Sequence, residues 1–423
     1  MTAFDVAGFD MQERNLMLRL PSFPTPPLTH PPRRQPKTRP YSAVTRYGVV
    51  PLLLLALGVR LGMYMERRGS ARAPVPAPPL HAPLPAPAPA AEPAAQAAPS
   101  CEMSGSFQNN IYPSLMLSFG VAYPEYARCL EVTLRGLPDS GALQLRIDSD
   151  LFLQPLEAAL NAASGSAAVS PELPWNYDTL RRTTQMEPHS FVATLLIDGK
   201  PEAQAPLVCT VHSVNEAVSR IFISSSGQWQ DTSVCFAAFV NEDHPLINAL
   251  LQEAMAGGSV RAFTGYQYGA QSAMQQAQAV WDALAARGLS YVNMATDSGT
   301  SALVSTQYVR FLEQSIRDKG ANCVDASVLF ASVLRRIGLR PVLLFRPGHC
   351  FTGFYDAPEG GHIVAFETSY LGAAPFATAA DEGMKELQTT LPFLGTPQFS
   401  VVDIALCRQQ GINPIPYQTP SAN

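Results

Sequence analysis

The sequence predicts an α+β protein in which a β-rich module, residues 106–216, precedes a domain of helices and strands, residues 217–423. Two observations carry this prediction. Apolar and polar residues alternate with period two over most of the first region, as in half-buried strands. Beyond residue 221, apolar residues recur every three or four positions, which is the spacing of amphipathic helices.

The composition limits the classes of protein to which the chain can belong. The chain has 423 residues, of which 47% are hydrophobic and 15% are charged, and its net charge is −5. That hydrophobic share suffices for a sizeable core. Nucleic acid is excluded as the main partner, because phosphate binding needs clustered Lys and Arg. Half of the 38 prolines lie in the first hundred residues, so we expect an unusual N-terminal part before an ordinary globular one.

The N-terminal part contains one candidate membrane segment. Residues 1–46 are Pro-rich and predict a disordered tail. Residues 47–65, "YGVVPLLLLALGVRLGMYM", predict a signal-anchor helix, with a cleaved signal peptide or a buried helix as the less favoured readings. The strictly apolar part ends before Arg60, which could snorkel to the interface. Positive charge before the segment predicts that the rest of the chain lies outside.

A linker and a β-rich module follow. Residues 66–105, rich in Ala and Pro, predict a semi-rigid spacer. The runs "LMLSFGVAY", "LEVTLRGL", "LQLRID", "FVATLLID" and "LVCTVHSV" predict strands of a β-sandwich of immunoglobulin type. The run "LQPLEAALNAAS" fits either a short helix or a strand. Cys129 and Cys209 lie in strand-like runs and either pair between the sheets or stay separate buried thiols.

The C-terminal domain begins with two predicted helices. "HPLINALLQEAMAGG" predicts a helix that ends at Gly257 and Gly258, and "AMQQAQAVWDALAARG" predicts one that ends at Gly288. The following "LSYVNM" predicts a short strand. These elements precede the segment in which the candidate catalytic residues lie.

Cys323 begins a third predicted helix. Asn322 is a good N-cap, apolar residues recur at helical spacing up to Ile337, and Gly338 ends the helix. The first turn of a helix stabilises an anion, so Cys323 stands where a thiolate is favoured. The runs "RPVLLFR", "HCFTGFYD" and "HIVAFETS" then predict three strands.

Three side chains from these elements form a candidate catalytic triad. Neighbouring antiparallel strands would bring His349 beside Glu367, with Cys323 as nucleophile, His349 as base and Glu367 fixing the imidazole. The plain alternative is a buried thiol near an incidental histidine. Gln307 in "STQYVRF" is a weaker candidate, as an oxyanion-hole amide.

The same residues carry a family resemblance. "NCVDASVLFASVLRRIGLRPVLL", "PGHCF" and "FETS" resemble the transglutaminase-like superfamily, a branch of the papain-like cysteine enzymes, and in particular its bacterial envelope-associated members. The resemblance is specific over about residues 307–372 and looser over 221–411. It implies a papain-like C-terminal domain with catalytic roles for Cys323 and His349. Glu367 stands where Asp is commoner in that family.

The resemblance also implies a location. The chain would be a single-pass protein of the bacterial inner membrane with its C-terminal domains in the periplasm. Cys350 follows His349, where the family more often has a small or aromatic residue. In an oxidising compartment, a Cys323–Cys350 disulfide would lock the nucleophile.

These expectations combine into one function and one alternative. We expect a membrane-tethered thiol enzyme that hydrolyses or transfers acyl groups of peptides or amides near the membrane. Hydrolysis is favoured, because the sequence has no acceptor-site signature and no calcium loop. The alternative is a catalytically silent binding or assembly module of the same fold. Neither a metal nor a nucleotide cofactor is expected, because the sequence has no Walker loop, dinucleotide fingerprint or His/Cys ligand cluster.

Overall fold

The computed structural model describes residues 98–417, apart from 121–122, 162–164, 225 and 294–298. It is a mixed α+β protein, as the sequence predicts. The predicted tail and the predicted anchor, residues 47–65, lie outside the described residues, as does most of the predicted linker. Among the helices of the described part, none combines the length and the apolar character that a membrane crossing requires.

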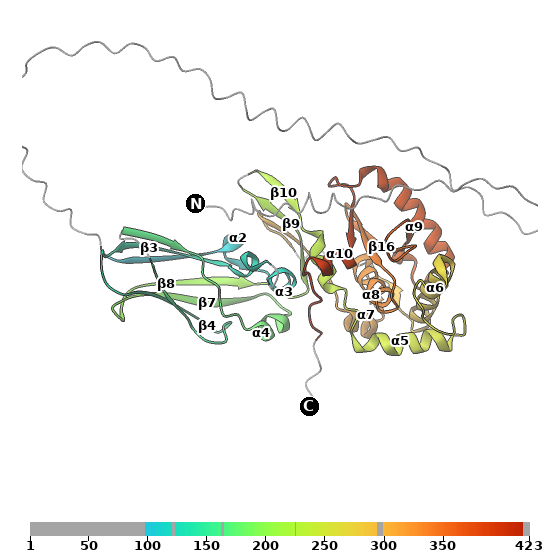
Figure 1. Ribbon diagram of the computed structural model, residues 1–423, viewed down its shortest axis with the longest axis horizontal. Helices are drawn as coiled ribbons and strands as arrows, with labels where there is room; N and C mark the ends of the chain where they lie inside the picture. The colour runs from blue at the N-terminus through green and yellow to red at the C-terminus, as the bar shows by residue number, and fades with distance from the viewer. Residues whose placement is uncertain (1–97, 121–122, 162–164, 225, 294–298, 418–423) are drawn as a thin grey trace, which may run out of the picture. The chain divides into compact units, whose positions relative to one another are not determined.

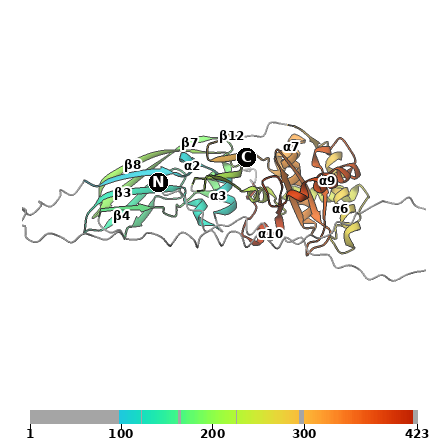
Figure 2. The same ribbon diagram turned by 90° about the horizontal axis from the view of Figure 1, so that it is seen from above.

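Two β-sheets in the first half share one apolar core. Their strands alternate between buried and more exposed residues, so that each sheet has one apolar face. Trp175 is buried in this core and packs edge-on against Phe152 and Phe191. Figures 1 and 2 show the long strands of the two sheets. The five-stranded sheet has the order β2 (Asn110–Ile111), β8 (Lys200–Val211), β7 (Glu187–Ile197), β4 (Leu143–Ser149) and β5 (Leu156–Ala159), and the three-stranded sheet has the order β1 (Ser100–Gly105), β3 (Leu130–Leu137) and β6 (Gly165–Val169).

The runs "LEVTLRGL", "LQLRID", "FVATLLID" and "LVCTVHSV" lie mainly in strands, as predicted, but two other predictions in this region are wrong. The run "LMLSFGVAY" predicted a strand, but its first half lies in a helix, α3 (Pro113–Phe119). Pro113 occupies the first turn, where its missing N–H has no cost. Nearly every side chain of α3 is buried, so its sequence lacks the polar face that would reveal helical spacing. In addition, β1 lies within the range that was expected to be linker.

The boundary expected between residues 216 and 217 falls at the start of a strand. A four-stranded sheet has β9 (Glu216–Ile223) beside β13 (Val304–Tyr308), which comes much later in the sequence. Leu115 and Phe119 of α3 belong to the same apolar core as Val324 of the later helix. The described residues therefore form one compact unit. The remaining strands of this sheet are β10 (Gln228–Asp231) and β12 (Gly299–Thr300).

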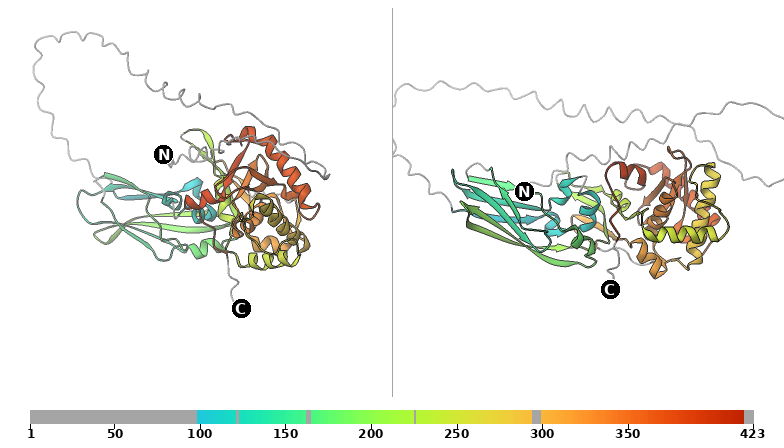
Figure 3. Two further views of the ribbon diagram at one scale, coloured as in Figure 1. Left: turned by 45° about the vertical axis from the view of Figure 1, so that its right-hand side comes forward. Right: turned by 60° about the horizontal axis from the view of Figure 1, so that its bottom comes forward.

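Another four-stranded sheet carries His349 and leads into Glu367, two of the candidate catalytic residues. Its four antiparallel strands have the order β17 (Ile363–Phe366), β16 (His349–Tyr355), β15 (Pro341–Arg346) and β18 (Ser400–Asp403). The helix α8 (Cys323–Arg336) packs against one face, and α9 (Phe376–Thr390) contributes to the core on the other. Figure 1 shows α8 beside β16, and Figure 3 shows the surrounding helices, in yellow to red, from two other sides. The other elements of this half are η2 (Ser233–Phe239), α5 (Pro245–Ala256), α6 (Gly269–Ala286), β11 (Ser290–Tyr291), α7 (Leu312–Asp318), β14 (Gly320–Ala321), η3 (Thr368–Tyr370), η4 (Leu391–Phe393) and α10 (Ile404–Gln409), and the first half also has α2 (Ser106–Asn109), η1 (Pro124–Ala127) and α4 (Tyr177–Arg182).

Both ends of α8 are fixed as the sequence predicts. Asn322 Oδ1 accepts from the backbone N–H groups of Val324 at 2.8 Å and Asp325 at 2.9 Å. Asp325 in turn accepts from the N–H of Asn322 at 3.2 Å, which completes a capping box. Such a cap stabilises a helix by about 1 kcal/mol. At the other end, Gly338 has a φ of 86°, which glycine adopts without strain.

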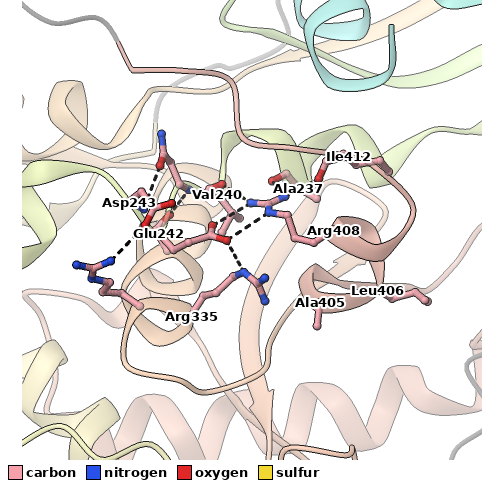
Figure 4. A network of polar contacts seen from close by, with 12 residues as sticks. Ala237, Val240, Glu242, Asp243, Arg335, Ala405, Leu406, Arg408 and Ile412 are labelled. Carbon is pink, nitrogen blue, oxygen red and sulfur yellow. Dashed lines mark hydrogen bonds and ion pairs between the residues drawn. The ribbon is translucent and has the colours of Figure 1, made fainter. Parts of the chain in front are cut away.

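A half-buried carboxylate ties the C-terminal segment to α8 (Figure 4). Glu242 accepts from Arg335 Nε at 2.5 Å and from Arg408 Nη2 at 3.1 Å. Burial raises the pKa of Glu242, but its bonds to the two arginines lower it by more, so the pKa lies below its usual value. Arg408 also donates to the carbonyls of Ala237 and Val240. This network holds η2, α8 and α10 in a fixed relation.

A close backbone approach places α9 on the strand next to the candidate site. A Cβ atom at Gly383 would overlap the backbone of Phe366, the last residue of β17. The N–H of Glu367 donates to the carbonyl of Ala379 in the same helix at 2.8 Å. Glycine at 383 therefore lets α9 lie directly on the chain segment that carries Glu367.

Candidate active site

Cys323 lies at the first position of α8 and is partly exposed. Its carbonyl accepts from the hydroxyl of Ser327 at 2.6 Å and from that of Thr368 at 3.4 Å. Among the described residues, no hydrogen bond uses the backbone N–H of Cys323. The sulfur therefore stands beside a free donor at the positive end of a buried helix.

His349 lies at the first position of β16, opposite Arg346 of β15. Pro347 and Gly348 form the two-residue turn between these strands, and Gly348 has a φ of 73°. Pro followed by a residue with positive φ is typical of a type II turn. The turn thus fixes the register that places the imidazole at the sheet end nearest the first turn of α8.

Glu367 directly follows β17 and is buried, with 7% of its surface exposed. Its Oε2 lies 2.7 Å from His349 Nε2, and its Oε1 accepts from the N–H of Ser369 at 3.0 Å. Both carboxylate oxygens are therefore engaged, which fixes the side chain. Since Nε2 bonds the carboxylate, Nδ1 is the ring nitrogen left for the thiol.

The imidazole interacts with both Cys323 and Glu367, and its pKa responds to them. Burial lowers the pKa of His349, whereas its hydrogen bonds and charge interactions with Cys323 and Glu367 raise it, to about 9. Burial raises the pKa of Glu367, and His349 lowers it by more, so that the pKa lies below its usual value. At neutral pH the pair is thus an imidazolium and a carboxylate. Positive charge beside a cysteine sulfur is typical of nucleophilic cysteines.

Contacts in the structure join the three residues proposed as a triad, and none of these contacts involves Gln307. Gln307 lies in β13 opposite Ala217 of β9. The catalytic roles of the three, and the oxyanion role of Gln307, stay predictions.

Tyr291 is a neighbour of the site that the sequence did not reveal. It lies in β11, which pairs in parallel with β14 and sets Tyr291 opposite Ala321, two residues before Cys323. Burial raises the pKa of Tyr291, and the negative charges of Cys323 and Glu367 raise it further. Its phenol therefore stays a hydrogen-bond donor at neutral pH. The run "LSYVNM" predicted only a short strand, and nothing local in it indicates this parallel pairing.

A polar recess of about 250 Å³ opens beside His349 and Glu367. The carboxylates in its wall have cationic partners: Glu386 pairs with Arg346, and Glu382 pairs with Lys385 at 2.5 Å. The recess thus has little net charge. Its wall is formed by Arg346, His349, Glu367, Ser369, Tyr370, Glu382 and Glu386.

Within the described residues, no group of three or more His, Cys, Asp or Glu side chains is arranged to hold a metal ion.

Comparison with protein-family models finds none that matches this chain, and comparison with curated proteins finds no match either. The arrangement of Cys323, His349 and Glu367 therefore has to be interpreted from its own chemistry. Such a set can form and hydrolyse a thioester.

Proposed function

We propose that the chain is a thiol enzyme that cleaves or transfers the acyl part of a peptide or amide through Cys323, His349 and Glu367. The observation that carries the proposal is the position of His349, whose pKa responds to Cys323 and whose Nε2 lies 2.7 Å from the carboxylate of Glu367. This is the nucleophile–base–orienter relation of covalent acyl transfer. The resemblance to transglutaminase-like enzymes around residues 307–372 supports the same chemistry.

The proposed reaction follows from the groups present. The Cys323 thiolate attacks the carbonyl carbon, and the tetrahedral intermediate collapses when His349 gives its proton to the leaving amine. A thioester on Cys323 remains. His349, now neutral, takes a proton from water or from an acceptor amine, which attacks the thioester and releases the acyl group. Glu367 holds the ring and stabilises its charged form throughout.

The finer features of the fold and the location belong to the same proposal. The C-terminal half would be a papain-like, transglutaminase-like domain. The two β-sheets that precede it would form an immunoglobulin-like module. Residues 47–65 would tether both to the bacterial inner membrane, and the domains would face the periplasm. The substrate would then be a peptide or protein close to the membrane.

We assign the oxyanion donors to the free backbone N–H of Cys323 and to the phenol of Tyr291. Replacement of Tyr291 with Phe removes only the hydroxyl and should lower kcat by about 10²-fold, because one oxyanion donor contributes that much. KM should change little. Tyr268, which is 71% exposed, offers the matched control in Tyr268→Phe. An unchanged kcat for Tyr291→Phe would contradict the assignment.

The proposed function is tested by the reactivity and turnover of the full chain. We expect iodoacetamide at pH 7 to label Cys323 at least about tenfold faster than Cys101, a partly exposed thiol whose pKa is raised by burial and by Glu102. Incubation with a peptide library should yield cleaved products and an acyl adduct on Cys323, neither of which Cys323→Ala should give. Equal labelling of both thiols would contradict an activated nucleophile. Fast labelling without any turnover would instead favour a silent binding module.

A further inference from the structure

A second thiol lies next to the candidate nucleophile. Cys350 follows His349 in β16 and is fully buried, with 0% of its surface exposed. It belongs to the apolar core that α8 forms with the sheet, together with Val324 and Val328. Cys323 packs against that same core. Both cysteines therefore contact the same apolar core, Cys323 from the start of α8 and Cys350 from β16.

Ser327, in the first turns of α8, lies between the two cysteines. The thiol of Cys350 donates to the carbonyl of Phe351 at 3.7 Å, and Ser327, which lowers its pKa, donates its own hydroxyl to the carbonyl of Cys323 at 2.6 Å. Burial raises the pKa of Cys350 well above its usual value, and the negative charge of Cys323 adds to this. One thiol is therefore partly exposed beside an imidazolium, while the other is buried and protonated within reach of the same helical turn. Redox-sensing proteins combine an accessible thiolate with a resolving cysteine in this way.

We propose that Cys350 is a resolving thiol for Cys323, so that a peroxide converts the pair to a disulfide instead of destroying the nucleophile. The inference goes beyond acyl transfer, although it relies on the reactive thiolate that the proposed function also requires. Both cysteines are free thiols in the structure, which is the reduced form.

The chemistry balances in two steps. The Cys323 thiolate attacks one peroxide oxygen, an S–O bond forms, the O–O bond breaks, and alkoxide or hydroxide leaves. Cys350 then attacks the sulfenic sulfur, so that an S–S bond forms, and the departing hydroxide takes the thiol proton to give water. Two thiols have lost two electrons to the peroxide, and a dithiol reverses the change.

The disulfide would switch off acyl transfer while it lasts. The sulfur of Cys323 would leave His349 and join the strand that carries this histidine, so no nucleophile would face the substrate. Cys323 would at the same time be protected from sulfinic and sulfonic acids, which dithiols do not reduce. A module exposed to an oxidising compartment would gain a reversible inactive state.

The test uses hydrogen peroxide on the full reduced chain, followed by alkylation, digestion and mass spectrometry. We expect one peptide pair joined between Cys323 and Cys350, which dithiothreitol separates. In Cys350→Ser and Cys350→Ala, Cys323 should instead reach the sulfinic and sulfonic states at least about tenfold faster. Cys407→Ser, which changes another buried thiol of the same core, should behave as wild type.

The outcomes separate this inference from the proposed function. Over-oxidation of Cys323 in the wild type as fast as in the Cys350 variants would overturn the resolving role. A failure of both variants to fold would leave the wild-type disulfide peptide as the deciding result, and its absence would overturn the role too. Disulfide formation without peptide cleavage would refute only the proposed enzymatic function. Cleavage without disulfide formation would refute only the resolving thiol.

Discussion

Replacement of His349 with glutamine is expected to lower kcat/KM by about 10²- to 10⁴-fold, because the variant loses its general acid and base. Glutamine keeps a polar side chain of similar length at the start of β16, so the sheet should persist. Alkylation of Cys323 at pH 7 should slow in parallel, since the thiolate loses its cationic partner. Turnover of a cleavable peptide and the rate of iodoacetamide labelling measure the two effects.

The matched control is His362→Gln. His362 precedes β17, pairs with Asp356 at 3.0 Å and has a side chain that is 63% exposed. It takes no part in the proposed triad, so kcat/KM should stay within about twofold of wild type. A fall of less than tenfold for His349→Gln would mean that the imidazole is not the proton carrier.

Replacement of Glu367 with glutamine is expected to move the alkaline limit of activity. The wild type should lose activity as pH rises through about 9, because His349 then no longer carries the proton for the leaving amine. Glutamine removes the negative charge 2.7 Å from the ring, so the pKa of His349 should fall by at least about one unit. The alkaline limb of kcat/KM should move to lower pH by the same amount. Glu253→Gln, which removes a carboxylate paired with Arg287, should leave the limb in place.

The same variant should change how stability depends on pH. The pKa of His349 in the folded state, about 9, lies above the ordinary value of 6.5, so the protonated ring stabilises the fold. That stabilisation is complete below about pH 6.5 and is lost as pH rises through about 9; it amounts to at most roughly 3 kcal/mol. The pKa of Glu367 is shifted downward, so its contribution is present above its ordinary value of 4.5 and is lost in acid. Both shifts arise from one ion pair, so the contributions do not add.

Urea unfolding at pH 5.5, 7 and 9.5 measures this effect. In the wild type the free energy of unfolding should fall between the first and the last of these pH values. In Glu367→Gln the fall should be clearly smaller. An equal fall in both proteins would show that the pair between His349 and Glu367 contributes little to the stability of the fold.

The sequence predicted the site elements well, because each has a strong local signal. Asn322 and Gly338 mark the ends of α8, and the turn at Gly348 sets His349 at a strand start. One error and one omission have a physical reason. The helix α3 is buried on nearly every side, which removes the polar face that would identify it. Tyr291 reaches the site through a two-residue parallel pairing with a distant segment, which no local pattern encodes.

The length of the Glu367 side chain has a structural account. The side chain of Glu367 bonds His349 through one oxygen and caps η3 through the other, by way of the N–H of Ser369. The backbone N–H of Glu367 is held by Ala379 of α9. An aspartate would have to serve both contacts with one methylene fewer, so exchange of the two residues is not conservative at this position.

The core that α3 shares with α8 decides how the protein can be shortened for laboratory work. A fragment that starts at residue 217 would lack the first residue of β9. It would also remove Leu115 and Phe119 from the apolar core to which Val324 of α8 belongs. Recombinant versions without the N-terminal hundred residues should instead begin just ahead of Ser100, so that the nucleophile's helix keeps its full packing.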